Sequence, residues 1–180
     1  MTIYELVIDE NAEVFGIDAI SIVESPAIES DFVALKSDKV EFAEVDKEKR
    51  ILMGAALVPN KPIYRRDDRG EFYVYFTKDT IRRAMELFMQ NGFQNNSTLE
   101  HEMRIQGLTV VESWIVEGEK DKAYHYDLDV PQGTWMVSVK VNNDAIWENF
   151  VKTGKVKGFS IEGYFANKTE LQAAKELEEV

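Results

Sequence analysis

Residues 154–165 read GKVKGFSIEGYF and place a serine near the middle of a short stretch that begins with a glycine. Side chains alternate between the two faces of a strand, so four residues are expected to share one face: Val156, Gly158, Ser160 and Glu162. Gly158 and Gly163 leave room for a close approach to the backbone on either side of the serine. The stretch therefore predicts a strand that carries a hydroxyl on a half-exposed sheet. Chemistry at Ser160 would need a partner from elsewhere in the chain.

The composition favours one folded domain. The chain has 180 residues, 44% hydrophobic and 11% aromatic, which is enough to bury a real core. Its net charge of −12 argues against nucleic-acid binding and against an anionic membrane surface. The absence of cysteine excludes disulfides, a thiol nucleophile and cysteine-based metal sites. The N-terminus, MTIYELVIDENAEV, lacks the pattern of a signal peptide, and no apolar stretch reaches the ~20 residues of a membrane span.

Strand-like periodicity recurs along the chain. The segments with this pattern are Thr2–Ile8, Phe15–Val23, Val40–Val45, Arg50–Val58, Glu71–Phe76, Ser97–Ile105, Leu108–Val116 and Thr134–Val141. The charged turn at 46–49 suggests a hairpin between the third and fourth of these segments, and Gln106-Gly107 suggests a second hairpin.

Three segments predict helices. One begins at Thr77 or Asp79 and ends at Asn91-Gly92, and another runs from Asn143 or Asp144 to Gly154. A third, at 167–179, has few large apolar residues and is expected to be peripheral. The pattern predicts an α+β fold with an antiparallel, partly closed β-barrel flanked by two or three helices. Residues 1–166 would form a single domain, with 167–180 as a C-terminal helix or tail.

His101, one of only two histidines, is the candidate partner of Ser160. If Gln106-Gly107 is a two-residue hairpin loop, counting back from it sets His101 opposite Glu112, within reach of its carboxylate. A carboxylate on one ring nitrogen fixes the histidine tautomer and supports the imidazolium. A slip of one residue in the register would turn Glu112 to the other face. A histidine hydrogen-bonded within the core is the alternative interpretation.

A base near Ser160 would allow nucleophilic catalysis, because a free serine hydroxyl is a poor nucleophile at neutral pH. The sequence G-F-S-I-E-G does not match the nucleophile elbow G-x-S-x-G. Asp127 and Asp129 near His125 are a weaker candidate for a cation or ligand site, for which a solvated loop is the plainer interpretation. Catalysis by Ser160, His101 and Glu112 would need no metal and no cofactor.

Several blocks of the sequence resemble a known family. The blocks are GIDAISIVESPAIESDFVAL at 16–35, LEHE at 99–102, GLTVVESWIVE at 107–117, and PQGTWMVSVKVNNDAIWENFVKTGKVKGFSIEGYF at 131–165. Together they are similar to the phage prohead (capsid maturation) proteases of the XkdF-like serine protease group, which are held to be related to herpesvirus assemblin. The resemblance covers almost the whole chain and implies an assemblin-like β-barrel flanked by helices.

The resemblance implies a serine endopeptidase of a kind that cuts phage scaffold and major capsid proteins, and often itself, within the assembling procapsid in the host cytoplasm. Ser160 would be the nucleophile and His101 the base. The third member stays open between Glu112, Asp18, Glu24 and His125, and a homo-oligomer is compatible with the resemblance. The rival hypothesis from another class is an inactive relative that serves as a structural or scaffold-binding component of the virion.

Overall fold

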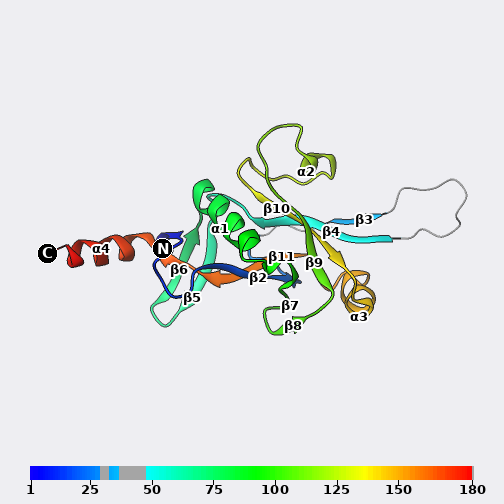
Figure 1. Cartoon of the computed structure of the whole chain (residues 1–180), viewed down its shortest axis with the longest axis horizontal. Helices are drawn as coiled ribbons and strands as arrows, with labels where there is room; N and C mark the ends of the chain where they lie inside the picture. Colours follow the sequence, from blue (N-terminus) through cyan, green and yellow to red (C-terminus); the bar gives the residue numbers. More distant parts are fainter. Residues whose placement is uncertain (29–32, 37–47, 180) are drawn as a thin grey trace, which may run out of the picture.

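The computed structural model describes residues 1–28, 33–36 and 48–179, and within them the protein has an α+β fold with three four-stranded sheets. The expected strand at 40–45 lies outside the described residues, and with it the hairpin at 46–49. Figure 1 shows the sheets at the centre of the molecule, with the C-terminal helix projecting from one end.

Each sheet is assembled from distant parts of the chain. The first has the order β12 (Ala166–Asn167), β1 (Ile3–Val7), β6 (Gly70–Tyr75) and β5 (Ile63–Asp67). The second has the order β3 (Val33–Lys36), β4 (Glu48–Leu57), β10 (Trp135–Val141) and β9 (Leu108–Ile115). The third, which carries the serine, has the order β11 (Gly158–Tyr164), β2 (Gly16–Val23), β7 (Ser97–Leu99) and β8 (Met103–Ile105).

The helices follow the sequence signals closely. The α1 helix (Lys78–Gln90) begins after Thr77, whose side chain accepts a hydrogen bond from the Thr80 N–H, and ends before Gly92 at φ 71°. The helix at α3 (Asp144–Ile146) is capped by Asn143 and continues into the π-helical turn η2 (Trp147–Val151). The remaining helical segments are η1 (Phe93–Asn95), α2 (Lys122–His125) and α4 (Lys168–Glu178). No helix was predicted in the stretches that form η1 and α2.

Aromatic packing joins the helices to the sheets. Phe88 of α1 is fully buried and meets the Trp135 ring edge-on, at 5.4 Å between centroids. Phe159, next to the serine, and Trp147 of η2 are also among the largest fully buried side chains. In contrast, α4 has no buried residue, as its weakly apolar sequence predicted.

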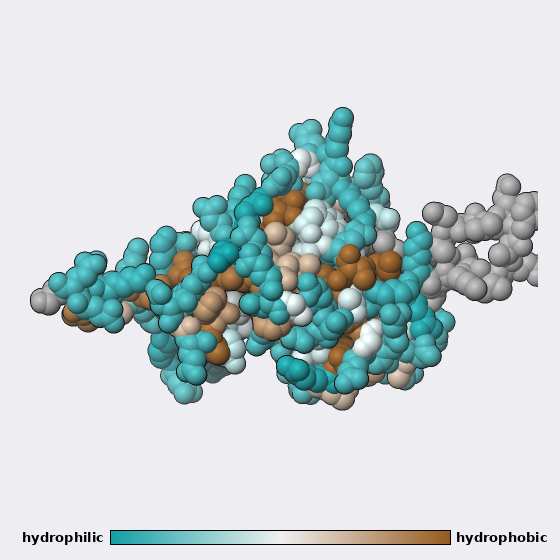
Figure 2. All heavy atoms as spheres, in the orientation of Figure 1, coloured by the Kyte–Doolittle hydropathy of each residue, from teal (hydrophilic) through white to brown (hydrophobic). Residues whose placement is uncertain are grey.

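The surface reflects the acidic composition. On the face drawn in Figure 2, hydrophilic side chains cover most of the molecule and of the projecting α4. None of the helices in the described part of the chain is long and apolar enough to cross a membrane.

Three expectations about the sheets are corrected. The sheets do not close into a barrel, and they are not purely antiparallel, because β1 pairs with β6 and β2 pairs with β7 in parallel. An assemblin-like barrel is therefore not confirmed. The hairpin expected across Gln106-Gly107 is also wrong: β8 pairs with β7, whereas β9 pairs with β10. The chain reverses earlier, at residues 100–102.

Candidate active site

Ser160 is the third of the seven residues of β11, an outer strand of its sheet. It stands directly opposite Ser21 of β2, and Ser21 in turn stands opposite Thr98 of β7. Directly opposed residues share a face of the sheet, so the three hydroxyl side chains form a row across it. Ser160 is 9% exposed and Ser21 is fully buried. The strand thus presents the hydroxyl that the alternation predicted, on a polar face of the sheet.

The bulge that follows Ser160 depends on a glycine. The register of β11 and β2 shifts between Glu162 and Gly163. A Cβ atom at Gly163 would lie 2.2 Å from the carbonyl oxygen of Gly16, so no other residue fits there without movement of the backbone. The close approach predicted from the sequence at Gly163 is confirmed, and the approaching group is the neighbouring strand.

His101 occupies the three-residue turn between β7 and β8, in an uncommon backbone conformation. Glu100 and His101 have φ values of 53° and 59°, in the left-handed region that non-glycine residues rarely adopt. The surrounding structure holds this turn: the His101 N–H donates to the Ser21 hydroxyl at 3.0 Å, and the Glu100 carboxylate accepts from the Glu24 N–H. Strained residues that are held from several sides are common at functional sites.

The imidazole of His101 contacts a carboxylate on the serine strand. Its Nδ1 lies 3.0 Å from Oε1 of Glu162, and the same oxygen accepts a hydrogen bond from the Thr98 hydroxyl. An ionised carboxylate only accepts hydrogen bonds, so Nδ1 carries the hydrogen and Nε2 of the neutral ring keeps its lone pair. This assignment makes Nε2 the nitrogen that is able to take a proton from a hydroxyl.

His101 and Ser160 therefore lie on the same side of one sheet. Glu162 is two residues beyond Ser160 on β11, and the His101 backbone bonds to Ser21, the residue opposite Ser160. No hydrogen bond joins the Ser160 hydroxyl to the imidazole in this structure. Catalytic hydrogen bonds are often long or absent in ligand-free enzymes and tighten when substrate binds.

Glu112 is not where the hairpin register put it. It stands on β9 in a different sheet, opposite Ser138, and its carboxylate pairs with Lys122. The prediction paired the two segments on either side of Gln106-Gly107, but these segments belong to separate sheets. Its place at the imidazole is taken by Glu162, whose position on the serine face the alternation had already indicated. A participation of Glu112 in catalysis stays a prediction.

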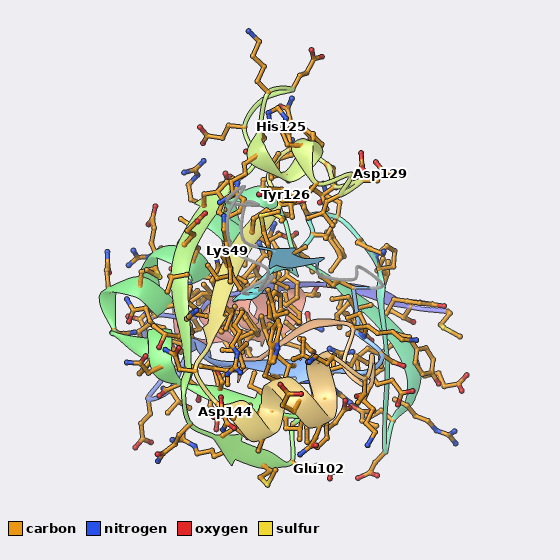
Figure 3. The ribbon with its side chains drawn as sticks, turned by 90° about the vertical axis from the view of Figure 1, so that its right-hand side faces the viewer. Lys49, Glu102, His125, Tyr126, Asp129 and Asp144 are labelled. Atoms are coloured by element: carbon orange, nitrogen blue, oxygen red, sulfur yellow. The ribbon has the colours of Figure 1, made fainter. Side chains whose placement is uncertain are left out.

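Among the described residues, none of the other candidates for the third member makes a hydrogen bond or an ion pair with the imidazole. Asp18 is on β2, where its carbonyl oxygen accepts from the Asn96 side chain, and Glu24 contacts Glu100 through its backbone. His125 ends α2. Figure 3 shows His125 and Asp129 at one end of the molecule and Glu102, the neighbour of His101, at the other.

No group of three or more histidine, aspartate or glutamate side chains within residues 1–28, 33–36 and 48–179 is arranged to hold a metal ion. This finding covers the segment around His125, Asp127 and Asp129.

A pocket opens along the outer edge of β11. It has a volume of about 260 Å³, and its lining includes both Ser160 and Ile161, which point to opposite faces of the strand. A pocket that touches consecutive residues in this way runs along the edge of the strand rather than over one face. Among the strands of the described residues, only β2 pairs with β11, and it occupies the other edge. An extended peptide is the ligand that such an edge can pair with.

The sequence comparisons bear on the same region. A family model described as "Putative phage serine protease XkdF" matches residues 39–170, a range that includes His101, Ser160 and Glu162. Neither the curated proteins nor the solved structures contain a match.

Proposed function

Because the chain belongs to the family of phage serine proteases represented by XkdF, we propose that it is a serine endopeptidase with Ser160 as nucleophile and His101 as general base. Glu162 orients and stabilises the imidazole. The observation that carries this assignment is the 3.0 Å contact between Nδ1 of His101 and Oε1 of Glu162. A carboxylate on Nδ1 leaves Nε2 for the hydroxyl, which is the arrangement of serine-protease triads.

In the proposed reaction, Nε2 of His101 removes the proton of the Ser160 hydroxyl as Oγ bonds to the carbonyl carbon of the substrate. The tetrahedral intermediate collapses when the imidazolium gives its proton to the leaving amine, and an acyl-enzyme remains. Water, deprotonated by the same imidazole, then releases the acyl group. Glu162 stabilises the imidazolium in both steps and keeps its own charge throughout.

The substrate is proposed to bind as an added strand along the outer edge of β11. Backbone hydrogen bonds to the edge would give affinity, and side chains directed into the neighbouring pocket would give specificity. Phage scaffold and major capsid proteins are the proposed substrates, cut within the assembling procapsid in the host cytoplasm, together with the protease itself. The family assignment and the edge pocket support this proposal.

The decisive experiment is co-expression with the scaffold and capsid proteins of the same phage. Wild type is expected to cleave them, whereas Ser160→Ala and His101→Ala are expected to leave them intact. A fluorophosphonate probe should label wild type and not Ser160→Ala. Equal cleavage by wild type and Ser160→Ala would remove the assignment.

A second candidate is an inactive relative that serves as a structural or scaffold-binding component of the virion. The missing hydrogen bond between Ser160 and His101 is the observation that favours it. In that case wild type would bind the scaffold protein, would resist the fluorophosphonate probe even in assembled particles, and would leave every protein uncut.

A further inference from the structure

The pocket beside Ser160 contains one charged side chain among apolar ones. Leu6, Ile63, Phe76 and Phe165 contribute apolar walls, and Arg65 is the only ionisable residue among the described residues that line it. Arg65 is on β5, in a different sheet from Ser160, so the pocket bridges the two sheets at the edge of β11. Any side chain that fills this pocket meets a guanidinium.

Arg65 has no acidic partner in the described part of the chain. Its only hydrogen bond there runs from a guanidinium nitrogen to the carbonyl oxygen of the adjacent Tyr64, at 2.9 Å. Four other arginines pair with carboxylates: Arg50 with Asp144, Arg69 with Asp67, Arg82 with Glu117, and Arg83 with Glu10. Arg66 and Arg104 likewise have no carboxylate partner among the described residues, so what distinguishes Arg65 is its place in the pocket beside Ser160.

The environment of Arg65 raises the cost of leaving its charge unmatched. The residue as a whole is exposed, yet the guanidinium lies against enough protein that burial lowers its pKa. Arginine nevertheless keeps its proton in proteins, so the group remains a cation in partly apolar surroundings. A carboxylate that arrives in the pocket would restore the charge balance and satisfy the planar donors two at a time.

We propose that this pocket selects substrates with an acidic side chain, glutamate or aspartate, close to the scissile bond, and that Arg65 binds its carboxylate. This inference rests on the proposed function. A substrate strand on the outer edge of β11 passes Ser160 and Ile161, and every second side chain points the same way. One of these side chains enters the pocket, where the apolar walls hold its methylene groups and Arg65 holds its charge.

The test needs one readout that depends on cleavage and one that does not. For cleavage, wild type and Arg65→Ala are incubated with a library of peptides derived from a bacterial proteome, and the cut sites are read by mass spectrometry. Wild type is expected to favour an acidic residue at one subsite. Arg65→Ala is expected to lose about 10- to 100-fold in kcat/KM for acidic peptides, in keeping with the loss of a charge-assisted hydrogen bond, and little for the matched glutamine peptides.

For binding, full-length Ser160→Ala is titrated with pairs of peptides that differ only in having glutamate or glutamine at one position. The peptides are taken from the observed cut sites, or from the library if no peptide is cut. The glutamate peptide should bind more tightly, and Arg65→Ala should abolish the difference. Arg66→Ala is the matched control, because Arg66 is next to Arg65 on β5 and does not line the pocket. Arg65→Lys keeps the charge without the bidentate geometry and should retain part of the preference.

The outcomes separate the two claims. If wild type cleaves and the acidic preference is unchanged in Arg65→Ala, the pocket assignment is overturned and the protease assignment stands. If wild type cuts nothing while Ser160→Ala still prefers glutamate through Arg65, the protease assignment falls and the pocket assignment stands. Equal binding of the glutamate and glutamine peptides also overturns the pocket assignment.

Arg65→Glu should shift the preference towards lysine peptides, which confirms the role of charge in a variant that keeps a long side chain.

Discussion

Glu162 Oε1 lies 3.0 Å from Nδ1 of His101, although the two residues are 61 positions apart in the chain. The contact spans the central strand β2, which separates β11 from β7. It requires the alternation of β11, which puts Glu162 on the same face as Ser160, and the left-handed turn, which brings the imidazole back over that face. This relationship gives Glu162 the position that a triad carboxylate needs.

Replacing Glu162 by glutamine should therefore impair the chemical step. The amide no longer fixes the tautomer or supports the imidazolium, so kcat should fall on the order of 10²- to 10⁴-fold with little change in KM. Cleavage of a fluorogenic peptide, chosen from the mapped sites, measures both constants. Glu162→Asp should recover part of the rate, which a purely structural role would not predict.

Glu112→Gln is the comparison that decides between the two carboxylates. The Glu112 side chain, on a different sheet from His101, pairs with Lys122, so Glu112→Gln should keep the wild-type kcat. A large loss of kcat in Glu112→Gln with normal activity in Glu162→Gln would reverse the assignment made from the geometry.

Ser21 holds the His101 turn through a hydrogen bond. Its buried hydroxyl donates to the Thr98 carbonyl oxygen and accepts from the His101 N–H. Ser21→Ala leaves the part-buried His101 N–H without its acceptor, and losing this hydrogen bond should cost about 0.5–1.5 kcal/mol in the free energy of unfolding. The turn also loses a restraint on the imidazole, so kcat should fall while KM changes little.

Ser138→Ala is the matched control for Ser21→Ala. The Ser138 hydroxyl is equally buried but makes no hydrogen bond in the described part of the chain. Removing it should leave stability unchanged or slightly raised, since an unsatisfied polar group is lost. Denaturant unfolding of both variants tests this pair, and equal losses would show that the bonds of Ser21 contribute nothing specific.

The sequence was sufficient to predict the main helices and most of the long strands, but not β5, β12, η1 or α2. The caps at Thr77 and Asn143 and the glycines at 92 and 154 mark helix ends through short-range hydrogen bonds and backbone preferences, which sequence reports directly. The residues that share a face of β11 were predicted from strand alternation, which is also a local property of the sequence.

Strand pairing could not be predicted in the same way. The Gln106-Gly107 signal indicated a hairpin, and Gly107 does have a positive φ of 82°. The reversal that pairs β7 with β8 instead occurs at Glu100 and His101. Neither residue is a glycine or an asparagine, the types that usually indicate a left-handed turn. That turn is held by Ser21 and Glu24 from β2 and beyond it, so its cause is tertiary. The role of Glu162 depended on this turn and was missed with it.

The end of the α4 helix, from residue 172 onward, should be dispensable for folding. None of its residues is buried, and its described ion pairs, Lys168 with Glu5 and Arg69 with Glu170, lie in its first turn. Deletion of residues 172–180 keeps both pairs and should change the free energy of unfolding by less than about 0.5 kcal/mol, as surface changes usually do. Thermal unfolding of the truncated chain measures the effect. A large drop in Tm would mean that the end of α4 packs against the body of the protein.

The glycine at 163 should be indispensable. A methyl group there would meet the Gly16 carbonyl oxygen at 2.2 Å, a contact that only a shift of β11 or β2 can relieve. Gly163→Ala should lower the free energy of unfolding by about 1–3 kcal/mol, the usual cost of overpacking. It should also lower kcat, because the strand that moves carries Ser160 and Glu162.

Gly118→Ala is the control for that substitution, since nothing lies within 4 Å of a Cβ atom at Gly118. It should leave both stability and kcat unchanged. If Gly163→Ala behaved like Gly118→Ala in denaturant unfolding and in peptide cleavage, the bulge after Ser160 would not be what holds the serine and the glutamate in place.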